Sequence, residues 1–450
     1  MTESDVIAAI ATPSGRGAVG IVRLSGDGAL DILNKIFRPV RQWESHRMYY
    51  GNIYAGGEVI DEVMACPMLS PRSYTRENTV EIYAHGGVAT LHGVLDAALI
   101  SGARLALPGE FTKRAFLNGR INLTQAEAVM DLIGATSGAA RRAGLRQLGG
   151  GLGKRIMAGR DRLLVWLANI ELSIDYPEHE EEAMNRATIL QEGHHWLRDM
   201  IALMESSSLG KVLREGIKTV ILGRPNVGKS TLLNAILGEE RAIVHEIPGT
   251  TRDVLTEQVQ LGDVVLRLMD TAGLRETTDP IEGIGVEKTN EAAKDAELIL
   301  YVMDYSKPTA QEDKEILSRL NDKHVIKILN KCDLPPGESV DDLGEAFKIS
   351  AQNRIGLTAL YDEIQCKFLK GLLSTQEAET DIITRERHKV LLQSAVDHVK
   401  QSMDELRQGT AEDLVSIGLR EAYMALGEIL GLEVSDDIVD RIFSEFCVGK

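Results

Sequence analysis

The sequence predicts a multidomain α/β fold: an α+β N-terminal domain, then an all-α helical domain into which a doubly wound, mostly parallel sheet domain is inserted. Two observations predict it. At 450 residues the chain is longer than one hydrophobic core usually supports, and a typical size of about 150 residues per domain suggests three domains. The spacing of apolar residues also changes along the chain, from strand-like to helical, then alternating, then helical again.

The N-terminal domain is expected over residues 1–118. Two β-branched runs in it, VGIVRL (19–24) and TVEIYA (79–84), lie between Gly, Pro and Ser turns and predict strands. From 119 to 212 apolar residues recur at three and four positions, which predicts helices. Residues 379–450 return to this pattern and are too short for an independent bundle, so we expect them to pack with those helices.

The sheet domain is expected over residues 213–378. Strand-like KTVILG (218–223) opens it, and further apolar runs follow, each succeeded by turn residues and a helical pattern. Such alternation is typical of a parallel sheet, because each crossover between parallel strands needs a helix. These further runs are VVLRLMD, ELILYVMD, HVIKILN and FKIS.

The composition is ordinary for a globular protein, with no apolar run of transmembrane length and no basic-then-apolar leader. We therefore expect a cytoplasmic protein without a membrane partner. The formal charge of −17 disfavours a stand-alone nucleic-acid binder, because it repels phosphate at long range. The cysteines form no C-x-x-C pair, which disfavours a disulfide framework and a zinc site. They are Cys66, Cys332, Cys366 and Cys447.

The segment GRPNVGKS (223–230) fits the phosphate-binding pattern G-x-x-x-x-G-K-[ST] and lies between a predicted strand and a predicted helix. Its glycines let backbone N–H groups surround phosphate oxygens at a helix N-terminus. Lys229 would neutralise the β and γ oxygens, and Ser230 would bind magnesium. The predicted nucleotide-binding residues here are Asn226, Val227, Gly228, Lys229, Ser230 and Thr231.

A second phosphate-facing group follows the strand VVLRLM. In DTAG (270–273), Asp270 would hold magnesium and Gly273 would donate its N–H to the γ-phosphate. In GTTRD (249–253), Thr250 or Thr251 would complete the metal shell as a mobile switch. The nucleotide-binding residues predicted from both segments are Gly249, Thr250, Thr251, Asp270, Thr271, Ala272 and Gly273.

Two further segments predict guanine rather than adenine. NKCD (330–333) follows a strand, and Asp333 would accept hydrogen bonds from the N1–H and N2–H of guanine, which adenine lacks. SAQ (350–352) would offer a backbone N–H to the guanine O6. The predicted base-reading residues are Asn330, Lys331, Asp333, Ser350 and Ala351.

The residue after DTAG is Leu274, where many small GTPases have a glutamine that orients the attacking water. Leucine can neither accept nor donate a proton, so another group must position that water. The segment DPIEGIGVEK supplies two candidates, Glu282 and Glu287. The residue types alone do not indicate which of the two glutamates positions the water.

The motifs GRPNVGKST, GTTRD, DTAGLR and NKCD, the mixed N-terminal domain and the C-terminal FCVGK together resemble the MnmE (TrmE) family of tRNA modification GTPases, over essentially the whole chain. The G motifs alone would indicate only the wider TrmE-Era-EngA-like class, which includes ribosome-assembly GTPases. The sequence shows no second G domain and no KH-like tail with GxxG, and this narrows the resemblance.

This resemblance implies a potassium ion where other GTPases use an arginine finger, with G domains pairing across a dimer. Glu282 matches the family's water-activating glutamate. His245 stands where many members have threonine, and Gly283 stands where arginine is common. The implied potassium ligands are Asn226, His245, Ile247 and Thr250. The same loop adds His245, Glu246, Ile247 and Pro248 to the nucleotide-binding set.

The resemblance also implies that the N-terminal domain binds a one-carbon tetrahydrofolate, as the 5-formyl or methylene form, and makes a constitutive homodimer. Four residues match the folate contacts: Arg23, Glu81, Arg120 and Lys450. Cys447 matches the family's C-x-G-K ending and is a candidate catalytic residue. Judged without the family, it would be a small buried hydrophobe at a helix end, and FCVGK is a poor prenylation box. Whether its thiolate attacks the uridine or only lines the site stays open.

The implied activity is hydrolysis of GTP to GDP and phosphate, coupled to tRNA modification with a flavin-dependent MnmG/GidA partner in a heterotetramer. The modification is an aminomethyl or carboxymethylaminomethyl group at C5 of the wobble uridine. The alternatives are a ribosome-assembly GTPase and a nucleotide-gated scaffold without its own modification chemistry. Residues 141–162 carry seven basic residues against one acidic; they would meet tRNA phosphates or an acidic partner, or form a solvated helix face.

Overall fold

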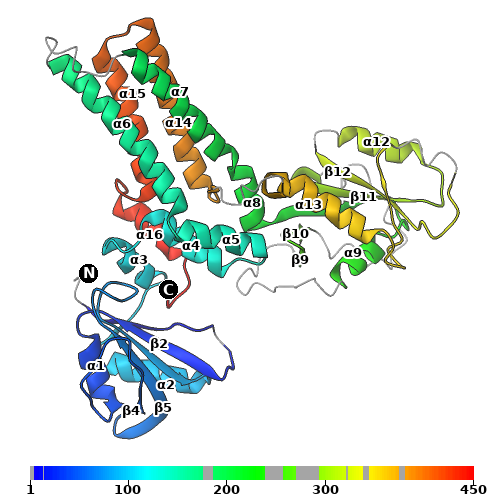
Figure 1. The fold of residues 1–450 in the computed structure, drawn as a ribbon. Helices are drawn as coiled ribbons and strands as arrows, with labels where there is room; N and C mark the ends of the chain where they lie inside the picture. Colours follow the sequence, from blue (N-terminus) through cyan, green and yellow to red (C-terminus); the bar gives the residue numbers. More distant parts are fainter. Residues whose placement is uncertain are drawn as a thin grey trace. The chain divides into compact units, whose positions relative to one another are not determined.

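The computed structural model describes residues 5–13, 15–175, 186–238, 257–269, 293–320, 323–337, 344–373 and 381–450 (Figure 1). The chain divides into two compact units. Unit 1 contains Met1–Met130, Leu148–Gly193 and Asp397–Lys450, and unit 2 contains Asp131–Gln147 and His194–Val396. The three domain boundaries expected from the sequence stay a prediction.

The first sheet of unit 1 has the strand order β3-β4-β5-β6-β2-β1-β7. Neighbouring strands are antiparallel except for β1 and β7, which are parallel. The two strands predicted from VGIVRL and TVEIYA are confirmed as β2 and β6, and their register pairs Arg23 with Glu81. The strands are β1 Ile7–Ile10, β2 Val19–Ser25, β3 Phe37–Arg38, β4 Tyr49–Ala55, β5 Glu58–Met68, β6 Thr79–His85 and β7 Arg104–Leu105.

Helices α1 (Ala29–Ile36) and α2 (Val88–Ile100) cover one face of this sheet (Figure 1). Their apolar side chains share one core with every second residue of the central strands, such as Leu24 and Ile82. Successive side chains of a strand point to opposite faces, so the residues between these core positions lie on the other face. That opposite face carries Arg23 and Glu81, and on it Ile7 and Ala9 pack with Phe111.

Helices of 8 to 25 residues form most of the rest of unit 1. Helices α6 (Gly151–Asp175) and α15 (Glu412–Leu430) run side by side and are joined by the ion pair Arg420–Glu171 at 2.7 Å (Figure 1). The C-terminal helices therefore pack with those of 119–212, as predicted. The remaining helices are α3 Glu110–Leu117, α4 Leu123–Ile133, α7 Arg186–Glu205, α14 Glu386–Gln408 and α16 Asp436–Ser444, of which α4, α7 and α14 contribute to both units.

Unit 2 contains a sheet of order β13-β12-β11-β8-β10-β9, parallel throughout except for the β9–β10 pair. All five strands predicted for the sheet domain are confirmed. The elements are α5 Gly138–Leu148, α8 Ser207–Glu215, β8 Ile217–Leu222, α9 Lys229–Leu237, β9 Glu257–Leu261, β10 Val264–Leu268, β11 Leu298–Asp304, α12 Gln311–Arg319, β12 His324–Asn330, β13 Phe347–Lys348 and α13 Leu357–Leu373.

Separate hydrophobic cores cover the two faces of this parallel sheet. In β8, Ile217 and Ile221 belong to one core and Val220 and Leu222 to the other. Every residue of β11 is buried, as expected for a central strand of a sheet covered on both faces. The carboxyl ends of β8, β11 and β12 consequently meet at one edge, where the predicted nucleotide motifs begin. Among the described helices, none combines the length and apolarity needed to span a bilayer.

Candidate functional site

The phosphate-binding loop connects β8 to α9 and depends on two glycines with positive φ. At Gly223 (φ +146°) a Cβ would lie 2.1 Å from the carbonyl oxygen of Val302 on β11. At Gly228 (φ +97°) a Cβ would lie 2.2 Å from Nδ2 of Asn330. Because side chains are excluded at both positions, the loop backbone can curl closely against the strand ends.

The Lys229 ammonium lies over this loop. Its Nζ donates hydrogen bonds to the carbonyl oxygens of Gly223 at 2.9 Å and Arg224 at 3.0 Å. Gly228 is the N-cap of α9, and no described side chain caps that helix. The helix therefore directs the positive end of its dipole into the loop, which suits an anion such as phosphate.

Asn330 joins the three predicted nucleotide segments of unit 2. Its Nδ2 donates to the Val227 carbonyl at 2.9 Å, and its Oδ1 accepts from the Ala351 N–H at 3.0 Å. Lys331 donates to the Asn226 carbonyl at 2.8 Å. The structure thus brings the motifs GRPNVGKS, NKCD and SAQ together, as the sequence predicted. In this structure the Ala351 N–H donates to Asn330. The hydrogen bond predicted from the SAQ backbone to the guanine O6 therefore stays a prediction.

The other members of the predicted set are placed as follows. Asp333 follows β12 with its side chain exposed, while Ser350 is buried and accepts a hydrogen bond from the Asn353 N–H at 3.3 Å. Ser230 and Thr231 lie in the first turn of α9. The remaining predicted residues lie outside the described part of the chain: His245, Glu246, Ile247, Pro248, Gly249, Thr250, Thr251, Asp270, Thr271, Ala272, Gly273, Glu282 and Glu287.

A second candidate site lies on the sheet face of unit 1 opposite helices α1 and α2. The Arg23 guanidinium contacts Oε1 of Glu81 through Nε at 2.9 Å and Nη2 at 2.8 Å. Tyr83 donates its hydroxyl to Oε2 of Glu81 at 2.6 Å. Burial, together with this hydrogen bond, raises the pKa of Tyr83 to about 12. Both charged side chains are only about 15% exposed, so they are not ordinary surface charges.

The C-terminal tail reaches this site. Arg23 Nη1 donates to the carbonyl of Gly449 at 3.2 Å, and the Gly109 N–H donates to the carbonyl of Cys447 at 3.3 Å. A Cβ on Gly449 would lie 2.4 Å from the Ile10 carbonyl, so only glycine permits this approach. Burial, and next the charge of Arg23, lower the pKa of Lys450. The Cys447 side chain is exposed, so its interpretation as a buried hydrophobe is wrong.

Tyr74 is a residue of this site that the sequence did not reveal. The guanidinium carbons of Arg23 and Arg120 lie 5.6 and 4.7 Å from its ring centroid, and its hydroxyl lies 3.0 Å from Oγ1 of Thr112. The guanidinium carbon of Arg23 also lies 5.7 Å from the ring centroid of Phe111. These cation–π contacts orient the two arginines. Tyr74 lies in a loop without hydrophobic periodicity, so only the fold places it here.

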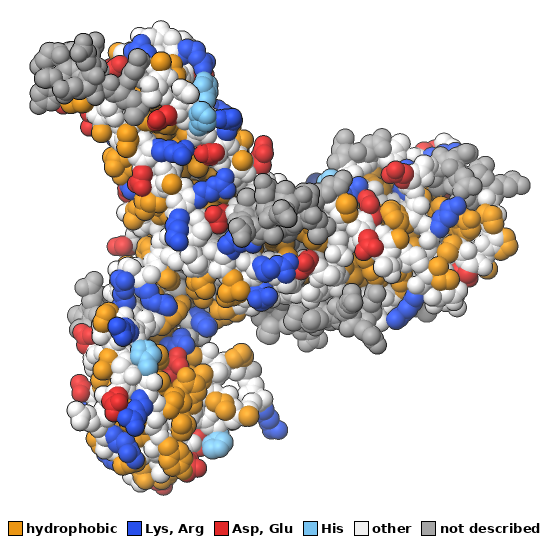
Figure 2. Space-filling view, viewed as in Figure 1, with side chains coloured by type: hydrophobic (Ala, Val, Ile, Leu, Met, Phe, Trp, Pro, Cys, Tyr) orange, Lys and Arg blue, Asp and Glu red, His pale blue; other side chains and the backbone are white. Residues whose placement is uncertain are grey.

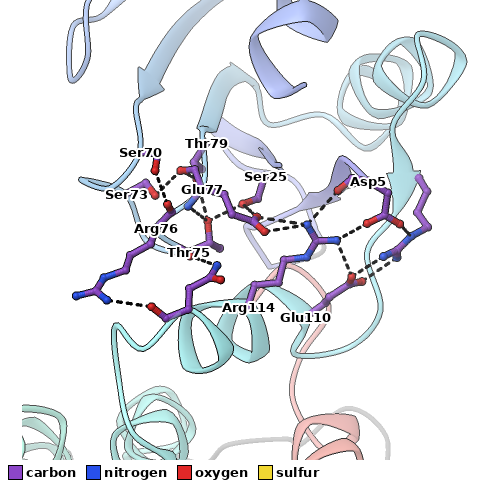
Figure 3. Close-up of polar contacts among 12 residues, drawn as sticks. Asp5, Ser25, Ser70, Ser73, Thr75, Arg76, Glu77, Thr79, Glu110 and Arg114 are labelled. Carbon is purple, nitrogen blue, oxygen red and sulfur yellow. Dashed lines mark hydrogen bonds and ion pairs between the residues drawn. The ribbon is translucent and has the colours of Figure 1, made fainter. Parts of the chain in front are cut away.

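A largely buried charge network anchors the loop that carries Tyr74 (Figure 3). Arg114 Nη2 donates to Asp5 at 2.7 Å and to Glu110 at 3.1 Å, while its Nη1 donates to Glu77 at 3.2 Å. Arg104 binds Asp5 at 2.6 Å and also Glu110. The hydrogen bond from Arg104 lowers the pKa of Asp5. Burial would raise the pKa of Glu110, but hydrogen bonds from Arg104 and the Leu107 N–H lower it.

The basic stretch 141–162 is divided between helices α5 and α6, on either side of a turn at Gly150 with φ +84°. Arg142 pairs with Asp263 at 3.0 Å in unit 2. Arg160 pairs with Glu433 and stacks on Tyr423 at 3.8 Å in unit 1. At least two of the seven basic residues are therefore used in contacts within the chain.

Family models match almost the whole chain. The model described as GTP-binding protein TrmE N-terminus matches residues 6–120, and the model described as MnmE helical domain matches residues 123–447. The protein named tRNA modification GTPase MnmE from Geobacillus thermodenitrificans is 44% identical over 464 residues, covering 100% of both chains. The chain belongs to the MnmE family.

Further similarities agree with this. The MnmE protein of Finegoldia magna is 42% identical, covering 99% of this chain and 100% of its own length. Among solved structures, the G domain of the T. maritima FeoB iron transporter is 23% identical over 34% of this chain and 98% of its own, with a TM-score of 0.23. That structural likeness is too small to add to the assignment.

The first prediction concerns the phosphate-binding loop of this MnmE-family chain. Gly228→Ala forces a side chain into a left-handed position beside Asn330, which costs roughly 1–3 kcal/mol of backbone strain. We expect affinity for a fluorescent GTP analogue to fall about tenfold or more in equilibrium titration. Gly344→Ala is the matched control, because Gly344 also has a positive φ (+69°) but no neighbour within 4 Å. Equal losses in the two variants would contradict the prediction.

The second prediction concerns the charge network of Figure 3. Arg114→Met leaves Asp5, Glu77 and Glu110 without their shared cation, and we expect the free energy of unfolding to fall by about 3–5 kcal/mol at pH 7. Denaturant titration measures it. The control is Arg47→Met, whose pair with Glu44 is exposed and should contribute less than about 1 kcal/mol.

The same network has a predictable pH dependence. The pKa values of Asp5 and Glu110 are lowered on folding, so their stabilisation is present above the ordinary values of 3.8 and 4.5 and is lost as the pH falls through the folded values. The difference between wild type and Arg114→Met should therefore shrink in acid. A difference that stays constant from pH 7 to pH 3 would refute this account.

Proposed function

We propose that this chain is a GTP-hydrolysing enzyme of tRNA modification. With a flavin-dependent MnmG/GidA partner, in a heterotetramer, it adds an aminomethyl or carboxymethylaminomethyl group to C5 of the wobble uridine of certain tRNAs. The observation that carries this proposal is the full-length similarity to proteins named tRNA modification GTPase MnmE. We place the reaction in the cytoplasm.

The nucleotide chemistry is proposed for unit 2. The N-terminus of α9 and Lys229 bind the phosphates, and the exposed Asp333 accepts the guanine N–H groups. Magnesium, when bound by Ser230, Asp270 and Thr251, neutralises charge that develops on the phosphate oxygens. The excluded Cβ positions at the loop glycines, and the N-terminus of α9, which no described side chain caps, support a phosphate ligand here. Glu282 is proposed to orient the attacking water.

Potassium is proposed to take the place of an arginine finger when two G domains pair. Asn226 stands at the outer edge of the phosphate-binding loop with an exposed side chain and φ +63°, and His245, Ile247 and Thr250 complete the proposed ligand set. A monovalent cation beside the β–γ bridge offsets charge on the leaving group. Oxygen donors from an amide and backbone carbonyls suit such a hard cation.

The sheet face of unit 1 opposite helices α1 and α2 is proposed to bind the one-carbon tetrahydrofolate and a second copy of the chain. Exposed apolar side chains gather on the strands of this sheet domain (Figure 2), among them Val19 and Tyr50 at 60% and Val59 at 55% exposed. Such a patch supports a protein–protein contact. Glu81, oriented by its two partners, suits the amino-pyrimidine edge of a pterin, and Arg120 and Lys450 suit the glutamyl carboxylates.

Cys447 is proposed to face the same ligand. Its exposed thiol is three residues from Lys450, in the same C-terminal tail that contacts Arg23. The thiolate either attacks the uridine ring or lines the site. A ribosome-assembly GTPase would have no use for a folate site, and a nucleotide-gated scaffold would have no use for a reactive thiol. These two differences separate the alternatives.

The third prediction tests the modification. Nucleoside analysis of tRNA from cells lacking this chain should show loss of the C5 modification at the wobble uridine, and the wild-type chain should restore it. Cys447→Ser should fail to restore it while its GTP hydrolysis and unfolding temperature match wild type. Unchanged wobble uridine in the deleted cells would overturn the function, whereas restoration by Cys447→Ser would overturn only the role of the thiol.

The fourth prediction tests the cation. GTP turnover by the purified chain should increase about tenfold or more when sodium is replaced by potassium at constant ionic strength. The reason is that the bound potassium ion stabilises negative charge that develops in the transition state. Asn226→Ala should lose that difference. Turnover that does not depend on the choice of cation would favour the scaffold alternative.

A further inference from the structure

Two aspartates that no nucleotide-binding motif includes hold the outer arm of the phosphate-binding loop, residues 223–226. Arg224, the second residue of the arm, binds Asp313 through Nε at 3.2 Å to Oδ1 and 3.0 Å to Oδ2. Asp313 lies in the first turn of α12 and is 1% exposed. It also accepts the Tyr301 hydroxyl at 2.9 Å and the Ala310 N–H at 3.3 Å. The arm is thereby tied to α12.

Asp304 holds the other end of the arm through Lys331. Its Oδ2 lies 2.7 Å from Lys331 Nζ, and the same ammonium donates to the Asn226 carbonyl at 2.8 Å. Asp304 Oδ1 accepts from the Ser306 N–H at 3.0 Å and from its hydroxyl at 2.7 Å. The hydrogen bonds from Ser306 fix the Asp304 carboxylate at the end of β11 independently of its contact with Lys331. The carboxylate is therefore a rigid support for that lysine.

These supports matter because Lys229 is not dedicated to the arm alone. Its ammonium already donates to the carbonyls of Gly223 and Arg224, and a bound phosphate competes for the same three N–H donors. The arm also contains Asn226 at φ +63°, a conformation that needs outside contacts to persist. The contacts through Asp304 and Asp313 do not involve Lys229, so they hold the arm however the lysine divides its hydrogen bonds between the loop and a phosphate.

We propose that Asp304 and Asp313 are positioning residues that keep the phosphate-binding arm in its nucleotide-binding shape, and so set guanine-nucleotide affinity without touching the nucleotide. The inference rests on the proposed GTP function. It adds the segment from the end of β11 to the first turn of α12 to the residues that govern nucleotide release.

The test measures dissociation of N-methylanthraniloyl-GDP from the full chain by stopped flow. Asp313→Asn and Asp304→Asn keep side-chain volume and remove the charge that holds the arm. We expect each to speed dissociation about tenfold, which corresponds to roughly 1.4 kcal/mol. Tyr301→Phe keeps the buried ring and removes one hydrogen bond to Asp313, so it should fold and show a smaller increase. Glu297→Gln is the control, because its pair with Lys211 lies outside the loop contacts.

A double-mutant cycle separates positioning from general stability. If Asp313 acts on the loop through Arg224, then Arg224→Met and Asp313→Asn together should speed dissociation no more than either does alone. Variants that lower the unfolding temperature but leave the dissociation rate of wild type unchanged would overturn the inference while leaving the GTP function intact. A wild-type chain that binds no guanine nucleotide would overturn the GTP function and this inference with it.

Discussion

The return of the carboxyl terminus to the N-terminal sheet is the constraint on which unit 1 depends. Gly449 can lie against Ile10 and accept from Arg23 only because it has no side chain. To bring the tail there, the last helices must run back beside α6, and the α6–α15 pair provides that path. Arg23 therefore has a strand partner, Glu81, and a tail partner, Gly449, 426 positions away in sequence.

Both units use buried charge to position backbone. In unit 1, Arg114 and its carboxylates hold the loop of Tyr74, which orients Arg23 and Arg120. In unit 2, Asp313 and Asp304 hold the phosphate-binding arm. Burying a charge is costly unless it is paired and hydrogen-bonded, and most of these carboxylates accept more than one hydrogen bond. Such networks fix one geometry, which a site that must receive a small ligand requires.

Local patterns predicted the elements well. The strands around KTVILG and HVIKILN, and the glycine-rich turn before α9, depend on neighbouring residues, so their periodicity and turn chemistry identified them. Local patterns did not predict the candidate site in unit 1, and only the resemblance to the MnmE family pointed to its residues. Arg23 and Glu81 become partners through antiparallel register, and Tyr74 and Phe111 join them from loops and a helix without any periodic signal.

The order of elements, the parallel sheet with its glycine-rich turn, and the motifs predicted to read guanine followed from residues close together in the chain. Tertiary structure alone decided that Asn330 braces the phosphate loop, that Arg114 and Asp313 support two different sites, and that Cys447 is exposed rather than buried. The physical reason is the distance along the chain over which each interaction acts. Backbone propensity and hydrogen bonding within a turn act over a few residues, whereas packing and charge pairing join side chains that only the folded chain brings within 3–6 Å.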